Sequence, residues 1–155
     1  MLTVRQRLLG AVVQACGGAR LERFDDRLLL QKRLYLLAAE GVDLGYVHSW
    51  YLRGPYCPAL TRDAFAVDRE NGLVGSTTAS PLPGVIAEKV TGLRNALGKY
   101  WTDPSQLELL ASVVFLSRTG SASSIEDRLG KLKPKYKSTE VDKAIEFATV
   151  RGWIK

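Results

Sequence analysis

Apolar residues recur at intervals of three and four along most of this chain, in runs that are interrupted by glycine, proline or aspartate. This spacing places the apolar side chains on one face of an α-helix, so the sequence predicts a mainly α fold. The first run covers residues 4–16 and ends at two glycines. The second run is expected to be capped by Asp25 or Asp26, and it ends at Gly41, a residue type that often stops helices.

The later runs predict five further helices. Their expected starts are Pro58, Ile86 and Pro104, followed by two capping boxes, Ser123 with Glu126 and Thr139 with Asp142. Between the second and third helices, residues 47–52 read VHSWYL, a stretch rich in β-formers that is bounded by Gly45 and Gly54. We expect one short strand there. The sequence therefore predicts about seven helices and a short β element.

The chain has 155 residues, close to the commonest domain size, so we expect a single domain over residues 1–155. Hydrophobic residues make up 46% of it and charged residues 25%, a balance that excludes a disordered or collagen-like chain. Arginines interrupt the N-terminal apolar run, which argues against both a membrane span and a secretory signal. These features predict a cytoplasmic protein that does not enter the membrane.

The last three helices, in residues 103–155, have the order of a winged helix-turn-helix, with Trp153 at the start of a wing strand. In that fold the third helix enters the major groove of DNA. Here its polar face carries Glu140, Asp142 and Glu146 against a single lysine, Lys143. Acidic side chains are repelled by phosphates, so the arrangement favours a packing unit or a partner surface over groove reading.

A basic segment, residues 128–137, supplies +5 of the net charge of +6 and contains no acidic residue. Lysines at alternate positions around a proline are expected to project outward and to contact phosphates or an acidic protein face. A solvated loop is the simpler alternative. The candidate nucleic-acid-binding residues are Arg128, Lys131, Lys133, Lys135, Tyr136 and Lys137.

Catalytic motifs are absent from the sequence. The only histidine, His48, lies next to Ser49 in the expected strand, where neighbouring side chains point to opposite faces, so the two are not expected to form a dyad. Phosphate-binding, dinucleotide-binding and zinc-binding motifs do not occur, and the two cysteines are far apart. We therefore expect no enzymatic activity, no metal site and no cofactor.

A family resemblance covers residues 28–65. Leu30-Gln31-Lys32 is followed by Leu34-Tyr35, then by an aromatic strand and by the turn Tyr51-Leu52-Arg53-Gly54-Pro55, which leads into a helix at Pro58. This order resembles the Panacea antitoxin domain family (SocA-like), and more closely its uncharacterised YwgA-like relatives. The C-terminal residues 132–154 resemble the YwgA-like proteins more weakly.

The resemblance implies a helical domain that binds partner proteins, as an antitoxin that neutralises a toxin or as an adaptor for proteolysis, and it implies no catalysis. The residues around the Gly-Pro turn agree with this, because tyrosine and arginine are enriched in binding hot spots. We expect them to face outward as a docking patch, although they could instead fill the core. The candidate partner-binding residues are Lys32, Tyr35, Tyr51, Arg53, Gly54, Pro55 and Tyr56.

The sequence therefore predicts a regulator that binds a partner protein, with toxin neutralisation or phage defence as its setting. The alternative is a winged-helix-like nucleic-acid-binding regulator that uses the basic segment. A third alternative is a small-molecule or nucleotide sensor, in which residues 71–84, rich in glycine, serine, threonine and proline, form a lid. The oligomeric state is not predicted, and a homodimer is among the alternatives.

Overall fold

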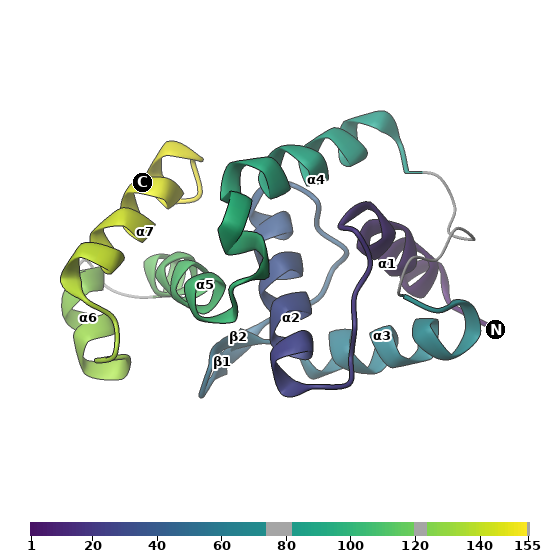
Figure 1. Ribbon diagram of the computed structural model, residues 1–155, viewed down its shortest axis with the longest axis horizontal. Coiled ribbons are helices and arrows are strands. Elements are labelled where there is room, and N and C mark those ends of the chain that lie inside the picture. Colours follow the sequence, from purple (N-terminus) through teal and green to yellow (C-terminus); the bar gives the residue numbers. More distant parts are fainter. Residues whose placement is uncertain (74–81, 120–123, 155) are drawn as a thin grey trace.

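A computed structural model describes residues 1–73, 82–119 and 124–154. In these ranges the chain forms seven α-helices, one 3₁₀ helix (η1) and a two-stranded antiparallel sheet (Figure 1), which confirms the mainly α fold with a short β element. The elements are α1 Val4–Ala15, α2 Phe24–Ala39, β1 Ser49–Tyr51, β2 Gly54–Tyr56, α3 Pro58–Asn71, α4 Gly84–Leu97, η1 Gly98–Thr102, α5 Pro104–Thr119, α6 Ile125–Leu132 and α7 Ser138–Val150.

Two helices, α2 and α5, lie at the centre of the molecule and pack against each other (Figure 1). α1, α3 and α4 pack on one side of this pair, and α6 and α7 on the other. Because neighbours cover them on several sides, the central helices are buried nearly all round rather than along one stripe. This explains why each also buries polar residues, Gln31, Lys32 and Arg33 in α2 and Glu108 and Ser112 in α5.

The helix starts differ by a residue or two from those expected. α2 begins at Phe24, and the Asp26 carboxylate accepts a hydrogen bond from the Arg23 amide, so neither aspartate is the N-cap residue. The N-cap of α6 is Ser124, not Ser123, which lies outside the described residues. α7 begins at Ser138, where Glu140 accepts a hydrogen bond from the amide before the helix, so the expected Thr139 box is wrong.

The short β element is a hairpin rather than the single strand expected. Trp50 lies opposite Pro55, and residues 52 and 53 form the turn. Gly54 has φ 89°, and no non-glycine residue of the described chain has a positive φ. A left-handed residue after a two-residue turn is the geometry of a type I turn with a glycine bulge, which explains why glycine occupies position 54.

The expected wing strand at Trp153 is wrong. Residues 151–154 turn back after α7 without forming a strand, and the Trp153 ring is buried against Phe147, 5.6 Å between ring centroids. The C-terminal helices therefore form a packing unit on α5. The lid expected in residues 71–84 falls largely outside the described residues. None of the described helices combines the length and apolar character needed to cross a membrane.

Candidate functional site

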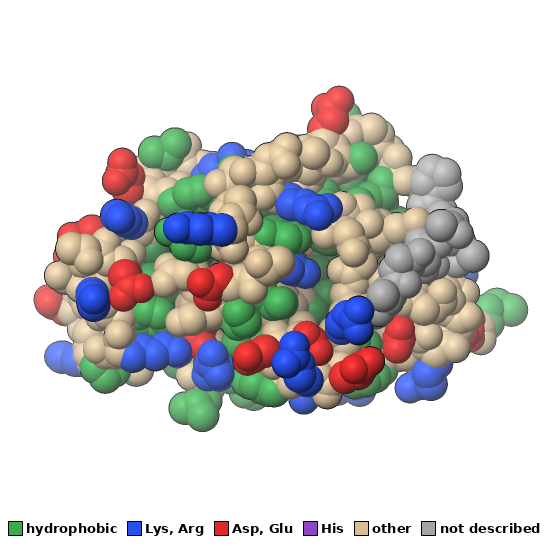
Figure 2. All heavy atoms as spheres, viewed as in Figure 1, with side chains coloured by type: hydrophobic (Ala, Val, Ile, Leu, Met, Phe, Trp, Pro, Cys, Tyr) green, Lys and Arg blue, Asp and Glu red, His purple; other side chains and the backbone are tan. Residues whose placement is uncertain are grey.

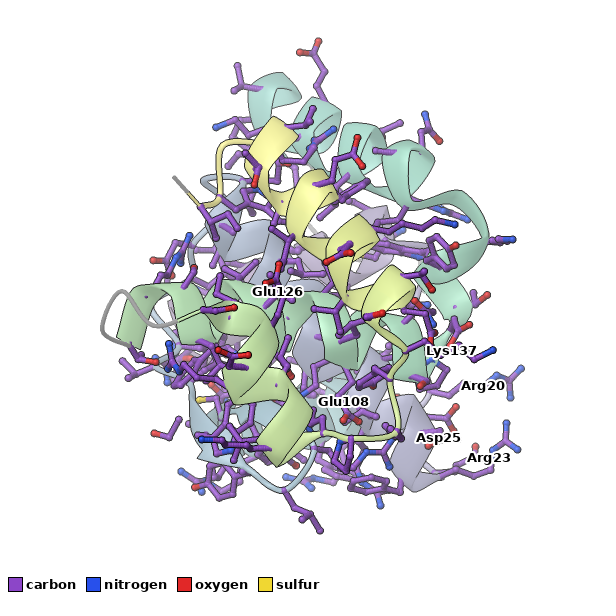
Figure 3. The ribbon with its side chains drawn as sticks, turned by 90° about the vertical axis from the view of Figure 1, so that its left-hand side faces the viewer. Arg20, Arg23, Asp25, Glu108, Glu126 and Lys137 are labelled. Atoms are coloured by element: carbon purple, nitrogen blue, oxygen red, sulfur yellow. The ribbon has the colours of Figure 1, made fainter. Side chains whose placement is uncertain are left out.

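A buried charged cluster lies beneath the hairpin, centred on Glu108 of α5. The Glu108 carboxylate pairs with Arg53 from the hairpin turn, with Lys133 at a distance of 2.7 Å, and with Lys135 at 3.7 Å. Figure 3 shows Glu108 beside the segment that joins α6 to α7. One carboxylate therefore connects the hairpin, α5 and the C-terminal pair of helices.

The Glu108 carboxylate stays ionised although it is buried. Burial alone would raise the pKa of Glu108, but hydrogen bonds and positive charges from Lys133 and Arg53 outweigh burial and lower that pKa. Lys133 also donates to the Leu52 carbonyl, 3.1 Å away, so it supports the hairpin turn directly. The cations keep the carboxylate ionised, and the carboxylate in turn holds the turn in place.

Lys32 of α2 is fully buried next to this cluster and donates a hydrogen bond of 2.5 Å to the Pro55 carbonyl. Burial lowers the pKa of Lys32 to about 7, although Glu108 acts in the opposite direction. Its neighbour Gln31 donates to the Cys57 carbonyl at 2.8 Å and accepts from the Cys57 amide at 2.9 Å. The Gln-Lys pair therefore attaches β2 and the start of α3 to α2.

The prediction that Lys32 and Tyr35 present a binding surface is wrong, because both side chains are buried. Tyr35 packs edge-on against His48, with ring centroids 5.0 Å apart. Burial lowers the pKa of His48 to about 4, so the imidazole is neutral at pH 7. The prediction for the corner itself, Gly54 and Pro55, is wrong for the same reason.

The tip of the hairpin is exposed, as expected for Tyr51. Leu52 is 91% exposed, and Tyr51 and Phe24 are about half exposed. Tyr51 packs edge-on against the half-buried Tyr56, and the Arg53 guanidinium lies 5.7 Å from the Phe24 ring centroid. Together they surround a shallow, mainly apolar hollow. Gly54 also lines this hollow, although it is buried. We call the surface formed by Phe24, Tyr51, Leu52, Arg53 and Tyr56 the hairpin tip.

The basic segment is partly used inside the protein, so its expected outward projection is wrong for several members. Lys133 is buried against Glu108, Arg128 donates to the Leu116 carbonyl, and the Tyr136 hydroxyl donates to the Ser105 carbonyl. Lys131, Lys135 and Lys137 remain exposed. On the face shown in Figure 2, Lys and Arg side chains are interspersed with Asp and Glu. Of the six candidate nucleic-acid-binding residues, these three lysines are therefore the ones that are exposed enough to contact phosphates.

Sequence reasoning missed Glu108 and its pairing with Lys133. One signal was present, because Glu108 interrupts the apolar run LELLASVV of α5 and therefore had to be buried with a partner. The partner was not identifiable, since Lys133 is 25 residues away. Sequence reasoning also missed Phe24, which lies just before the expected cap of the second helix and was not considered.

The described residues contain no group of three or more His, Cys, Asp or Glu side chains that could hold a metal ion. No family model, curated protein or solved structure matches this chain significantly. The resemblance to the Panacea antitoxin domain family therefore stays a prediction based on residues 28–65.

Proposed function

We propose that this protein is a non-catalytic regulator that binds a partner protein through the hairpin tip. The observation that carries the proposal is the exposure of Leu52, Tyr51 and Phe24 side by side around an apolar hollow. Large apolar and aromatic side chains that stand together on a surface mark interaction sites more often than scattered ones do.

The anchoring of the tip supports the proposal. Lys32 and Lys133 hold its backbone by donating to the Pro55 and Leu52 carbonyls, and Glu108 holds the Arg53 side chain. A surface held in one conformation loses little conformational entropy on binding, which favours affinity. The buried residues of the Leu-Gln-Lys motif would then serve recognition indirectly, by positioning the side chains that touch the partner.

Neutralisation of a toxin, or adaptor activity, is the role that the resemblance implies, and we propose it as the setting of this binding. Nucleic-acid binding through the basic segment is the less favoured candidate, because Lys133 and Arg128 make contacts inside the protein. A DNA complex that weakens steeply with added salt would favour that alternative.

The test uses a photoreactive residue placed at position 52 and, as a control, at position 150, where Val150 is 80% exposed on α7. In cells, position 52 is expected to give one discrete crosslinked protein that position 150 does not give. With that protein purified, Leu52→Asp is expected to weaken binding by at least about tenfold, the scale of a hot-spot residue. Val150→Asp is expected to leave the affinity unchanged.

Equal crosslinking from both positions, or an affinity unaffected by Leu52→Asp, would contradict the proposal. If the partner is the product of a neighbouring gene and is toxic, co-expression gives a second readout. The wild-type chain and Val150→Asp should restore growth, whereas Leu52→Asp should not.

A further inference from the structure

The hollow at the hairpin tip is lined by charge of one sign. Arg53 is the only charged residue among the described ones that line it. The volume of the hollow is about 280 Å³, just below the range of pockets that enclose a whole small molecule. A side chain of a partner protein is therefore a better-sized occupant. The other lining residues are aromatic, aliphatic or glycine: Phe24, Tyr51, Leu52, Gly54 and Tyr56.

The charged cluster beneath the tip holds more positive than negative charge. Glu108 supplies its carboxylate, and three cations contact that carboxylate, namely Arg53, Lys133 and Lys135. Three cations against one carboxylate leave two positive charges uncompensated. An uncompensated charge close to a surface attracts groups of the opposite sign.

This positive surplus reaches the surface beside the hollow. Lys133 is buried, whereas the side chains of Lys135 and Arg53 are 50% and 33% exposed. Because Lys135 and Arg53 contact the same carboxylate, the Lys135 ammonium lies near Arg53 and therefore near the hollow. Arg53 contacts Glu108 through Nε, and its two terminal nitrogens have no hydrogen-bond partner among the described residues. These nitrogens are available to a carboxylate of a partner.

The chain around Phe24, on the other side of the hollow, does not alter this balance. Arg23 and Asp26 of this segment pair with each other at 3.8 Å. Residues 20–27 contain three arginines and three acidic residues, so the segment is neutral overall. The net charge beside the hollow is therefore set by Arg53 and Lys135.

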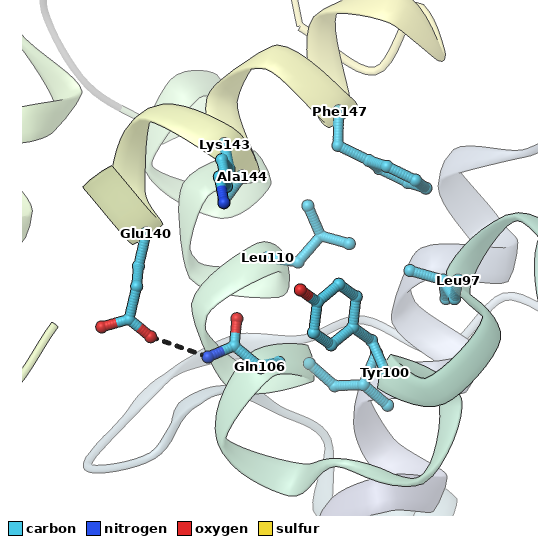
Figure 4. Close-up of a pocket in the computed structure, with 9 residues that line it drawn as sticks. Leu97, Tyr100, Gln106, Leu110, Glu140, Lys143, Ala144 and Phe147 are labelled. Atoms are coloured by element: carbon cyan, nitrogen blue, oxygen red, sulfur yellow. Dashed lines mark hydrogen bonds between the residues drawn. The ribbon is translucent and has the colours of Figure 1, made fainter. Parts of the chain in front are cut away.

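A second hollow, between α4 with η1, α5 and α7, lacks this asymmetry (Figure 4). Its charged residues among the described lining are Lys143 and Glu140, one of each sign. Hydrogen bonds from the Lys137 backbone amide and the Gln106 side chain lower the pKa of Glu140, so its carboxylate is ionised at pH 7. Charge indicates no class of ligand for that hollow, whereas at the hairpin tip it favours an anion.

We propose that the hairpin tip recognises an acidic segment of the partner protein, in which an apolar side chain fills the hollow and a neighbouring carboxylate meets Arg53 and Lys135. This recognition rests on the proposed function, which assigns the surface but not the chemistry of its partner. A guanidinium can bind a carboxylate through two parallel hydrogen bonds, which fixes the orientation of the segment. The apolar contact supplies most of the binding free energy, because exposed charge pairs contribute little alone.

Selection from short random peptides displayed on phage tests this chemistry without a known partner. The wild-type chain is the bait, and peptides that also bind Leu52→Asp are removed first. The retained peptides are expected to carry aspartate or glutamate next to a large apolar residue. Retained peptides without acidic residues, or rich in lysine and arginine, would overturn the preference for an acidic segment and leave the hairpin tip as the binding surface.

Fluorescence anisotropy with one retained peptide then measures the contribution of charge. Lys135→Gln is expected to weaken binding by about two- to fivefold, the scale of an exposed ion pair. The matched change Lys89→Gln, on α4 at the opposite side of the molecule from the hairpin, should leave the affinity unchanged (Figure 1). When the acidic residue of the peptide is changed to its amide, Lys135→Gln should have no further effect.

Both lysines are exposed, so both variants should fold as the wild type does, which circular dichroism checks. An unchanged affinity in Lys135→Gln, or an equal loss in Lys89→Gln, would overturn the proposal. The absence of any peptide that depends on Leu52 would also overturn it, because the proposal requires a short segment. Crosslinking from position 52 does not depend on the charge of the partner, so it still decides the proposed function separately.

Discussion

Lys32 supports the hairpin tip although its own side chain is buried and does not reach the surface. Burying the Lys32 side chain costs free energy, since desolvation disfavours its charged form. It is tolerated because its ammonium donates to the Pro55 carbonyl and because Glu108 lies nearby. Lys32 therefore holds the hairpin in its conformation. We expect its substitution to lower the free energy of unfolding, and to weaken partner binding only as a consequence.

Lys32 is expected to make the stability of the protein depend on pH. Its pKa is about 7 in the folded chain and about 10.5 when unfolded, so above pH 7 the unfolded chain holds a proton that the folded chain has released. The free energy of unfolding should then rise with pH, with a contribution approaching about 1.4 kcal/mol per pH unit between pH 7 and 8.5. Urea unfolding of the wild type and of Lys32→Met at several pH values measures this contribution.

Lys32→Met is expected to have the flatter profile over that interval, and Lys131→Met, at an exposed lysine, should keep the wild-type slope. Parallel profiles for the wild type and Lys32→Met would show that Lys32 stays protonated in the folded protein. The interval stops at pH 8.5 because burial raises the pKa of Cys16 and of Tyr35 to about 12. Those two groups reverse the slope at higher pH, where the unfolded chain loses their protons first.

At the level of the elements, the sequence was most informative where apolar spacing alone decides the structure. The helices were predicted because each has an apolar face, and α5 begins at Pro104 as expected, with Asp103 capping it by accepting from the Ser105 and Gln106 amides. β2 was not predicted because Gly54-Pro55-Tyr56 contains two residue types that strands avoid. It forms because α2 and α5 cover it, which is a tertiary effect.

The site was predicted less well than the fold for a related reason. Tyr51 was chosen for its residue type and is exposed, whereas Arg53, chosen for the same reason, is only partly exposed because its guanidinium pairs with Glu108. Lys32 was chosen from a motif, and a motif does not reveal whether its members point outward or inward. The wing strand failed similarly, because Trp153 has a high β-propensity but is held on Phe147.

The hairpin turn gives a test at this scale, because two separate effects require glycine at position 54. Its φ is positive, and a Cβ atom there would lie 2.8 Å from the Ser112 hydroxyl oxygen. Gly54→Ala is expected to lower the free energy of unfolding by about 2–4 kcal/mol. Gly45→Ala has the same backbone strain, with φ 86°, and no atom within 4 Å, so it should cost about 1–2 kcal/mol.

Ser112→Ala separates the two effects, because the Ser112 hydroxyl has no hydrogen-bond partner among the described residues and its loss should cost little. In Gly54→Ala/Ser112→Ala the close contact is relieved, so urea unfolding should show that about 1 kcal/mol of stability is regained. Strict additivity of the two single changes would mean that the contact is accommodated without cost and that backbone strain alone selects glycine.

For the whole molecule, the central finding is that one carboxylate joins parts of the chain that are distant in sequence. Glu108 pairs with Arg53 and Lys133, so it connects the hairpin to the C-terminal helices through α5. Removing one member of a buried ionic network leaves the others uncompensated, which is more harmful than losing a surface pair. The domain is therefore expected to unfold as one unit, with this cluster as a main determinant.

Glu108→Gln is expected to lower the free energy of unfolding by about 3–5 kcal/mol. The control is Glu40→Gln, which removes a partly exposed pair with Arg151, 2.6 Å apart, and should cost about 1 kcal/mol. Urea unfolding followed by circular dichroism and by tryptophan fluorescence measures both. In the wild type the two signals should change together, and a tryptophan fluorescence transition that precedes the loss of helix would instead show that part of the domain unfolds separately.

Both cysteines, Cys16 in the cap of α1 and Cys57 before α3, are free thiols sealed from solvent. An alkylating reagent can reach them only when the surrounding helices separate. The rate at which these thiols are alkylated therefore measures how often the N-terminal half opens. Mass spectrometry can follow that rate in the wild-type protein, without an added probe. It would register whether occupation of the hairpin tip slows that opening.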